Sequence, residues 1–274
     1  MPHFDLTLDA PLARAGHFLA PVAVDTHVQH ITATEFHGAA PLAMLRAANS
    51  GQQAWLCRLE AGATPRIRYR FEAPGLGLPE WAFRPAGTRF DIASADLAGE
   101  IATLVPSGPP AQRVPRLMQF VADRFQYGRR EQHLGDDLAA MPALGCDRNT
   151  GTCVDMHTLA VAALRAIGVE AVYAIGGFVY EGRDSFPTGH CWLNLRAVGA
   201  AHHYDISHHV EYNLGPVTPA LNPKPGRRFT LGLGRGLVFD GPEGAVEIPS
   251  LSGWYGLDGT TKGTKLKTIG RFDA

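Results

Sequence analysis

The chain has 274 residues, of which 45% are hydrophobic and 19% charged, a balance typical of a globular protein long enough to bury a core. Its 25 Lys and Arg nearly balance its 26 Asp and Glu, and the formal net charge is −1. This charge argues against a chain-wide surface for nucleic acid or anionic membrane, so we expect neither as a partner.

Residues 1–90 are predicted to form a β-rich domain. Short runs rich in β-branched and aromatic residues are separated by turn sequences such as NSG and APG. In the run RIRYRF, Ile67, Tyr69 and Phe71 alternate with arginines, as in a strand with one buried face. The first residues lack the basic and apolar regions of a signal peptide, and cysteines are few. We therefore expect a cytoplasmic protein with reduced thiols.

Residues 91–210 begin with helical patterns. Apolar residues recur at helical spacing over 93–105 and again over 111–128, where Val114, Leu117, Met118, Val121 and Phe125 make a core-facing stripe. A third short helix is expected over 136–144. The segment 153–167 reads as a further helix with Thr152 as its N-cap, followed by strands over 169–182, 190–198 and 202–210. Residues 211–274 are predicted to be a β and irregular extension packed on this core.

Cys153 opens the helix that follows the polar loop GCDRNTGT. The first turn of a helix presents backbone N–H groups without intrahelical partners, and the helix dipole adds partial positive charge there. Both effects favour the thiolate form of a cysteine, and the same N–H groups can stabilise an oxyanion. Cys153 therefore has the setting of a nucleophile.

A thiolate nucleophile needs an imidazole as proton carrier, and the imidazole needs an orienting group. The segment GHCWLNLRAVGAAHHYDIS supplies both, because His190 opens one strand and Asp205 closes the next. A hairpin centred on Ala197 and Val198 makes His190 and Asp205 cross-strand or diagonal neighbours.

At this point the sequence resembles the bacterial transglutaminase-like proteins of the papain-like cysteine peptidase superfamily. GTCVDMHTLAVAALRAIGV is similar to their cysteine segment, GHCW to their histidine strand and YDIS to their aspartate strand, in the same order. The likeness is strongest over 93–208. Cys191 stands where alanine is commoner in the family, and Ile206 stands where proline is usual.

The resemblance implies an α+β fold, with a papain-like, transglutaminase-like core over 91–210 behind an N-terminal β-rich domain. It implies Cys153 as nucleophile, His190 as general base and acid, and Asp205 as orienting residue. The oxyanion hole would use the Cys153 N–H and a side-chain donor, with Tyr127 as first candidate and Gln126 as second. Strand alternation predicts that Cys191 faces away from His190 as a small buried residue.

The function expected is cysteine-dependent acyl transfer, with a peptidase or amidase favoured, a peptide or small amide as substrate, and no cofactor or metal. The alternatives are a transglutaminase-type enzyme with an amine acceptor and a non-catalytic binding module of the same fold. An arylamine acetyltransferase is disfavoured because NTGTC lacks the Arg-Gly-Gly approach to the cysteine. We also weighed a metal site, with Cys153 and His157 or the nearby histidines as ligands, and a Cys146–Cys153 disulfide. Those histidines are His202, His203, His208 and His209.

Overall fold

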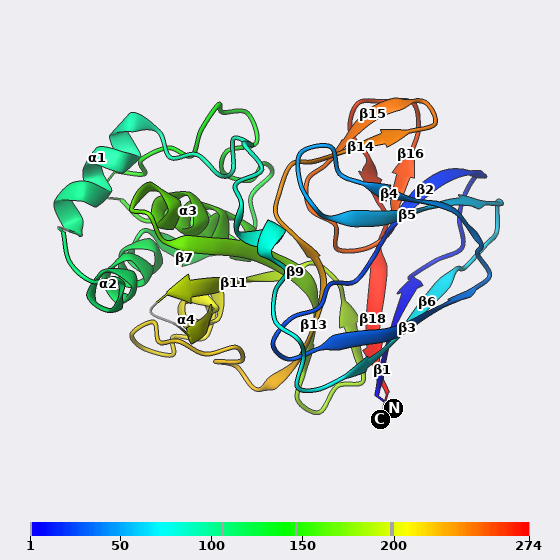
Figure 1. The fold of residues 1–274 in the computed structure, drawn as a ribbon, viewed down its shortest axis with the longest axis horizontal. Helices are drawn as coiled ribbons and strands as arrows, with labels where there is room; N and C mark the ends of the chain where they lie inside the picture. The colour runs from blue at the N-terminus through cyan, green and yellow to red at the C-terminus, as the bar shows by residue number, and fades with distance from the viewer. Residues whose placement is uncertain (1, 106, 146, 198–199, 274) are drawn as a thin grey trace. The chain divides into compact units, whose positions relative to one another are not determined.

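The computed structural model describes residues 2–105, 107–145, 147–197 and 200–273, with the backbone alone described at 197 and 200–202. The chain divides into two compact units, which are described separately below. The first, here called the β unit, comprises Met1–Ala82, Ala174–His190 and Pro225–Ala274. The second, the helical unit, comprises Phe83–Tyr173 and Cys191–Lys224. Figure 1 gives the course of the chain through both.

One five-stranded sheet of the β unit has the order β10-β18-β1-β6-β3. Its neighbouring strands are antiparallel, and Phe4 of β1 lies between Tyr69 of β6 and Phe272 of β18. The strands of this sheet are β1 (His3–Leu8), β3 (His30–His37), β6 (Arg66–Glu72), β10 (Ser185–Pro187) and β18 (Thr268–Phe272).

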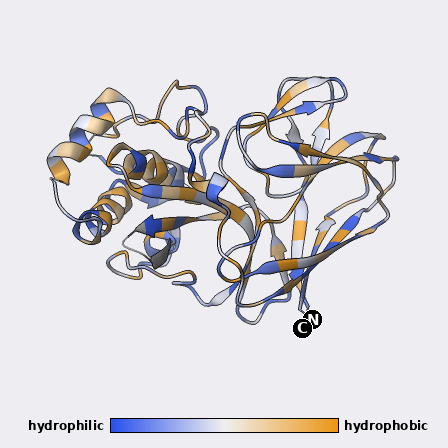
Figure 2. Ribbon diagram, in the orientation of Figure 1, coloured by the Kyte–Doolittle hydropathy of each residue, from blue (hydrophilic) through white to orange (hydrophobic). Residues whose placement is uncertain are grey.

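The alternation expected along β6 is confirmed. Ile67, Tyr69 and Phe71 are buried, while the arginines between them remain partly exposed. These arginines are paired with neighbouring strands, because Arg68 donates two hydrogen bonds to Asp5 of β1, at 2.8 and 2.9 Å. Figure 2 shows the resulting mixture of hydrophilic and hydrophobic bands along the strands of this unit.

A second five-stranded sheet has the order β17-β16-β2-β5-β4, and β14 and β15 form a separate hairpin. The C-terminal strand β16 pairs with β2, as β18 pairs with β1, so the last part of the chain completes both sheets begun by the first part. The strands are β2 (Gly16–Pro21), β4 (Pro41–Arg46), β5 (Gln53–Leu59), β14 (Leu237–Gly241), β15 (Gly244–Ile248), β16 (Tyr255–Leu257) and β17 (Thr264–Lys265).

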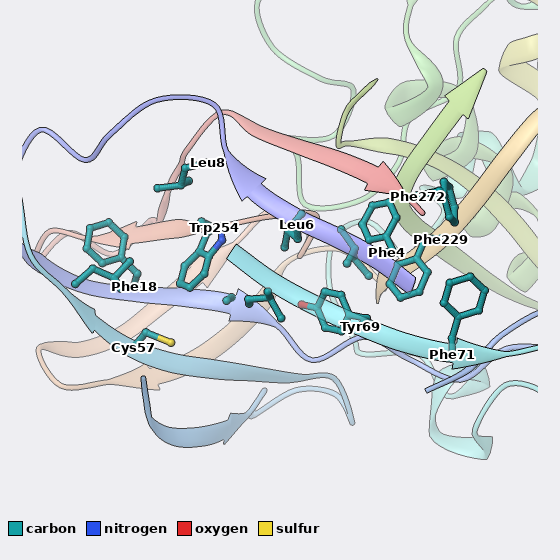
Figure 3. Packing of buried hydrophobic residues seen from close by; sticks show 14 of the residues in the cluster. Phe4, Leu6, Leu8, Phe18, Cys57, Tyr69, Phe71, Phe229, Trp254 and Phe272 are labelled. Atoms are coloured by element: carbon teal, nitrogen blue, oxygen red, sulfur yellow. The ribbon is translucent and has the colours of Figure 1, made fainter. Parts of the chain in front are cut away.

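The core of the β unit is built on aromatic side chains from distant parts of the sequence (Figure 3). The rings of Phe4 and Phe229 are stacked with centroids 4.4 Å apart, and Phe272 meets Phe4 edge-on at 5.1 Å. Tyr69 and Phe71 pack on Phe229 from β6. Such packing adds the directional preference of aromatic pairs to the burial of their large apolar area.

The helical unit contains α1 (Ala95–Leu104), α2 (Pro110–Asp123), α3 (Cys153–Ala166) and α4 (Ile206–Glu211). The stripe expected on α2 is confirmed, since Val114, Leu117, Met118 and Val121 are buried there, whereas Phe125 lies in the following strand β7. Eleven residues of α3 are buried, more than one face of a helix provides. α3 is therefore the central helix of this unit.

A four-stranded sheet has the order β12-β11-β9-β13, and a two-stranded sheet joins β7 and β8. These strands, with the 3-10 helix η1, are η1 (Glu80–Phe83), β7 (Phe125–Tyr127), β8 (Asn149–Gly151), β9 (Glu170–Tyr180), β11 (His190–Ala197), β12 (Ala200–Tyr204) and β13 (Gly226–Leu233).

Three local predictions were wrong. The helix expected over 111–128 ends at Asp123, and the chain continues as the strand β7 (Phe125–Tyr127). The short helix expected over 136–144 is a series of turns, with Gly135 at a φ of 86° and Pro142 unable to donate a helical hydrogen bond. The strand expected to continue through 206–210 is instead the helix α4, because the Asp205 side chain caps it by accepting from His208 N.

The predicted division into 1–90, 91–210 and 211–274 remains a prediction about domains. The compact units of the structure are assembled from alternating stretches of chain, and the strands from β16 onward pair with β1, β2 and one another. Among the helices described, none combines the length and the apolar character needed to cross a membrane.

Candidate active site

Cys153 is the first residue of α3, as the sequence predicted. Thr152 is the N-cap, in an extended conformation, and its side-chain oxygen accepts from Val154 N at 3.3 Å. The strand β8 delivers the chain to this point and pairs in parallel with β7, with Tyr127 opposite Gly151. The Cys153 side chain is 7% exposed. The nucleophile candidate therefore lies at a rigid, nearly buried helix start where thiolate is favoured.

Asp155 fixes that helix start. Its carboxylate accepts from the N–H and hydroxyl of Thr152, at 2.8 and 2.9 Å, which completes a capping box. It also accepts from Leu134 N at 2.7 Å and lies 3.2 Å from His133 Nδ1. Burial alone would raise the pKa of Asp155, but these hydrogen bonds, His133 foremost, hold the pKa at about 2. A charged carboxylate thus ties α3 to the loop before it.

Asp205 directly follows β12 and caps α4. One carboxylate oxygen accepts from Ser207 Oγ at 2.7 Å and from His208 N at 3.1 Å, and the other lies 3.1 Å from His208 Nδ1. In the pairing of β11 with β12, Leu193 lies opposite Tyr204. A register that set His190 directly opposite Asp205 would differ from this one by two residues. An offset of two preserves the face of the sheet, so Asp205 becomes a diagonal neighbour of His190.

His190 and Asp205 lie close together, with His208 as a third member. One nitrogen of each histidine and one oxygen of Asp205 lie within 4.8 Å of one another. The boundary between the two units falls inside β11, between His190 and Cys191, and the unbroken strand carries His190 with the residues that follow it. Sequence analysis predicted that His190 and Asp205 are neighbours, but it considered His208 only as a metal ligand. The predicted closeness of His190 to Cys153 stays a prediction.

Two histidines and a carboxylate are also residue types that bind zinc. Here, however, both Asp205 oxygens already accept or face hydrogen-bond donors of Ser207 and His208. Asp205 and His208 are therefore joined by hydrogen bonds, and the absence of a metal stays a prediction. Of the other histidines weighed as ligands, His203 is bonded to Asn194 Oδ1 at 2.6 Å, and the His202 side chain lies outside the described residues.

His157 is a second buried histidine in this region, and its tautomer follows from its contacts. Its Nε2 accepts the backbone N–H of Ile206 at 3.0 Å, so Nε2 carries no proton. The proton of the neutral ring is then on Nδ1, which lies 3.5 Å from Cys191 Sγ. Nε2 also lies 3.7 Å from Asp205 Oδ1, but an unprotonated nitrogen makes no ion pair with a carboxylate. His157 therefore donates to Cys191.

Cys191 is buried, as expected, but it is more than a small apolar residue. Besides His157, its thiol interacts with the side chains of Cys153 and Tyr173. Burial, and then the hydrogen bond and charge of Cys153, raise the pKa of the Cys191 thiol well above its ordinary value, against a lowering by Tyr173. Cys191 is therefore a neutral thiol beside the nucleophile candidate.

The two candidate oxyanion donors lie on β7. Gln126 pairs with Thr150 across the ladder and donates its side-chain amide to Thr150 Oγ1 at 2.9 Å. Tyr127 is one residue closer to Cys153 along the ladder, opposite Gly151, and is 39% exposed. These contacts do not test either residue as an oxyanion donor, but the side-chain amide of Gln126 already donates to Thr150.

The Cys146–Cys153 disulfide that was considered involves Cys146, which lies outside the described residues.

The family to which these residues point can now be named. Residues 97–215, which contain the side chains described above, match the model of the transglutaminase-like superfamily. The match covers residues 97–215, here called the transglutaminase-like region. This region includes Cys153, His190 and Asp205, and its similarity points to a class of cysteine-dependent acyltransferases and peptidases without specifying one activity.

Two solved structures are similar to this chain. A "putative cysteine protease" from Cytophaga hutchinsonii is 14% identical, with a TM-score of 0.50 over 99% of this chain and 97% of that one. The periplasmic domain of TgpA from Pseudomonas aeruginosa is 13% identical, with a TM-score of 0.37 over 76% of this chain and 88% of that one. A search of the curated proteins returned no match. The family match and the Cytophaga hutchinsonii structure confirm the expected α+β, papain-like fold class.

Sequence reasoning missed His157 and His208 as members of this site. The spacing of Cys153 and His157, four residues apart on a helix, signals a shared face, but it was weighed only as a metal-ligand pair. His208 follows Asp205 by three residues, which identifies a partner only once Asp205 is known to cap a helix.

Proposed function

We propose that this chain is a cysteine-dependent acyl-transfer enzyme that hydrolyses an amide bond through an acyl-enzyme on Cys153. The observation that carries the proposal is the close grouping of His190, the first residue of β11, with Asp205, which follows β12. The next residue of β11, Cys191, interacts with Cys153. A sulfur nucleophile, an imidazole and an orienting carboxylate are the parts that acyl transfer requires.

In the proposed mechanism, His190 takes the proton of the Cys153 thiol, and the thiolate attacks the carbonyl carbon of the amide. The negative charge that develops on the carbonyl oxygen is stabilised by the Cys153 backbone N–H and the Tyr127 hydroxyl. When the C–N bond breaks, His190 gives its proton to the departing amine. The acyl group is then a thioester on Cys153.

The second half of the reaction reverses these roles. His190 takes a proton from water, the resulting hydroxide attacks the thioester carbonyl, and the Cys153 thiolate leaves as the carboxylic acid is released. Asp205 holds the His190 ring in one orientation and stabilises its charged form. An amine in place of water would give a new amide, which is the transglutaminase alternative.

The substrate class we propose is a peptide or small amide, since no charge excess favours a nucleic acid or membrane partner. We propose the cytoplasm as the compartment, on the basis that Cys57, Cys153 and Cys191 are free thiols. Cell fractionation tests the compartment, and recovery of the protein with periplasmic markers would overturn it.

Acyl-enzyme trapping tests the reaction. The protein is incubated with panels of amides and esters, with and without added primary amines, and Cys153 is examined by peptide mass spectrometry. We expect an acyl adduct on Cys153 that decays to the free acid in water, and no adduct in Cys153→Ala. Amide products that dominate when amines are present would favour transglutaminase chemistry, while the absence of any adduct across reactive esters would favour the non-catalytic module.

A further inference from the structure

The neighbourhood of the Cys153 sulfur contains a directional series of hydrogen bonds. It starts at the backbone N–H of Ile206, which donates to His157 Nε2 at 3.0 Å. The neutral imidazole then has its proton on Nδ1, which faces Cys191 Sγ at 3.5 Å. The Cys191 sulfur thus accepts from His157, and its own S–H proton remains to be donated elsewhere.

Besides His157 and Tyr173, Cys191 interacts with Cys153, which is the candidate acceptor. Cys153 and His157 are four residues apart on α3 and so lie on the same helix face, with Cys191 of β11 packed against that face. The side chain of Cys191 also interacts electrostatically with that of Cys153. Both cysteines are buried and free, so the contact is between a thiol and a thiol or thiolate.

The direction of a hydrogen bond between these two sulfurs follows from which of them holds its proton more firmly. Cys191 is fully buried with the negative charge of Asp205 nearby, and both conditions raise the pKa of its thiol. Cys153 has the N-terminal end of α3 to stabilise negative charge. The proton therefore stays on Cys191 when one of the two ionises.

We propose that the neutral Cys191 thiol donates a hydrogen bond to the Cys153 thiolate and so keeps the nucleophile in its reactive form. This inference rests on the proposed function, since it assigns the tuning of that same nucleophile. Cys191 touches the reacting sulfur and is a further catalytic residue, while His157 acts through Cys191 and is a positioning residue.

The titratable groups on the elements that carry or adjoin this pair are all retained in the variants below. They are Asp155 and His157 on α3, Tyr173 on β9, His190 on β11, Asp205 and His208 at α4, Tyr127 on β7, and Arg130 and His133 in the loop bound to Asp155. A difference between variants at position 191 therefore reports the donor at that position.

The test measures the pH dependence of Cys153 alkylation by iodoacetamide in the full chain, read by peptide mass spectrometry. Loss of a donor to the thiolate in Cys191→Ala should move the midpoint upward by about one pH unit, which is about a tenfold lower thiolate-to-thiol ratio below it. Cys191→Ser retains an O–H donor, so its midpoint should stay within a few tenths of the unmodified chain.

The matched control is Cys57→Ala, which removes a buried thiol of the β unit whose pKa burial raises to about 12. Its midpoint should equal that of the unmodified chain. Equal midpoints for Cys191→Ala and the unmodified chain, or equal shifts for the alanine and serine variants, would overturn the inference. Because alkylation needs no substrate, such a result leaves the proposed function standing if the acyl adduct on Cys153 still forms.

Discussion

Asp155 is the residue whose charge most directly supports the candidate site. Its pKa of about 2 lies below the ordinary value of 3.8, because hydrogen bonds from His133, Thr152 and Leu134 outweigh the effect of burial. A group whose pKa is lower in the folded than in the unfolded state stabilises the folded state fully at pH values above its unfolded-state pKa. That stabilisation is lost as the pH falls through its folded-state pKa. Asp155 should thus contribute about 2 kcal/mol that disappears between pH 4 and pH 2.

The variant Asp155→Asn tests this contribution. It should lower the free energy of unfolding by about 2 kcal/mol at pH 7 and flatten its decline between pH 4 and pH 2, measured by urea unfolding at a series of pH values. Asp96→Asn is the matched control, since Asp96 is an exposed aspartate in the first turn of α1, where the loss should be about 0.5 kcal/mol. If the decline of the unfolding free energy between pH 4 and pH 2 is the same in Asp155→Asn as in the unmodified chain, other carboxylates cause that decline.

At the scale of elements, the pairing of β7 with β8 positions the start of α3. A Cβ at Gly151 would lie 2.7 Å from the ring of Phe125 and 3.0 Å from Asp155 Cβ, and Phe125 is buried and cannot move freely. Gly151→Ala should therefore cost about 2 kcal/mol through overpacking. It should also displace Cys153, with a fall of about 100-fold in kcat/KM or in the rate of Cys153 acylation.

Gly99→Ala gives the contrasting result for the same chemical change. Gly99 is exposed inside α1, and an added Cβ meets nothing within 4 Å. The substitution should raise the free energy of unfolding by about 1 kcal/mol through helix propensity and leave acylation unchanged. Similar behaviour of the two variants in thermal unfolding and acylation would contradict the positioning role of the β7–β8 pair.

The elements differ in how far the sequence could predict them. The helix of Cys153 was predictable because Thr152 is a strong N-cap and an apolar run follows it. The helix α4 was not, because the histidines of YDISHHV have no strong helix or strand propensity and the decisive signal is a cap formed by the catalytic candidate Asp205. The contacts of Cys191 were equally hidden, since alternation predicts a face of the sheet but not which helix side chain packs against it.

At the scale of the whole molecule, the compact units are assembled from segments that are far apart in the sequence. Local patterns identify residues 1–90 as β-rich, but they carry no signal that β1 is placed between β6 and the C-terminal strand β18. Such pairings between the two ends of a chain depend on long-range packing, here of Phe4 against Phe229 and Phe272. The β unit is therefore assembled from three stretches of chain.

The fragment 1–90 should consequently fail to fold alone. It lacks β18, which leaves one edge of β1 unpaired, and it lacks the two phenylalanine rings that cover Phe4. We expect poor dispersion of its amide proton NMR signals and rapid proteolysis, in contrast to the full chain. A well-dispersed spectrum from the fragment would show that 1–90 is an independent domain and that its C-terminal partners are dispensable.

Point substitutions in the full chain test the same packing without removing any segment. Phe229 is fully buried and contacts Phe4, Tyr69, Phe71 and Phe272, so Phe229→Ala should cost about 4 kcal/mol of unfolding free energy. Phe186 in β10 is 40% exposed, and Phe186→Ala should cost about 1 kcal/mol. Phe229 joins residues 225–274 to β1 and β6 of residues 1–82. A much larger loss for Phe229→Ala in one cooperative urea transition would mean that these two stretches unfold together, whereas equal losses would mean that the N-terminal strands are stable without it.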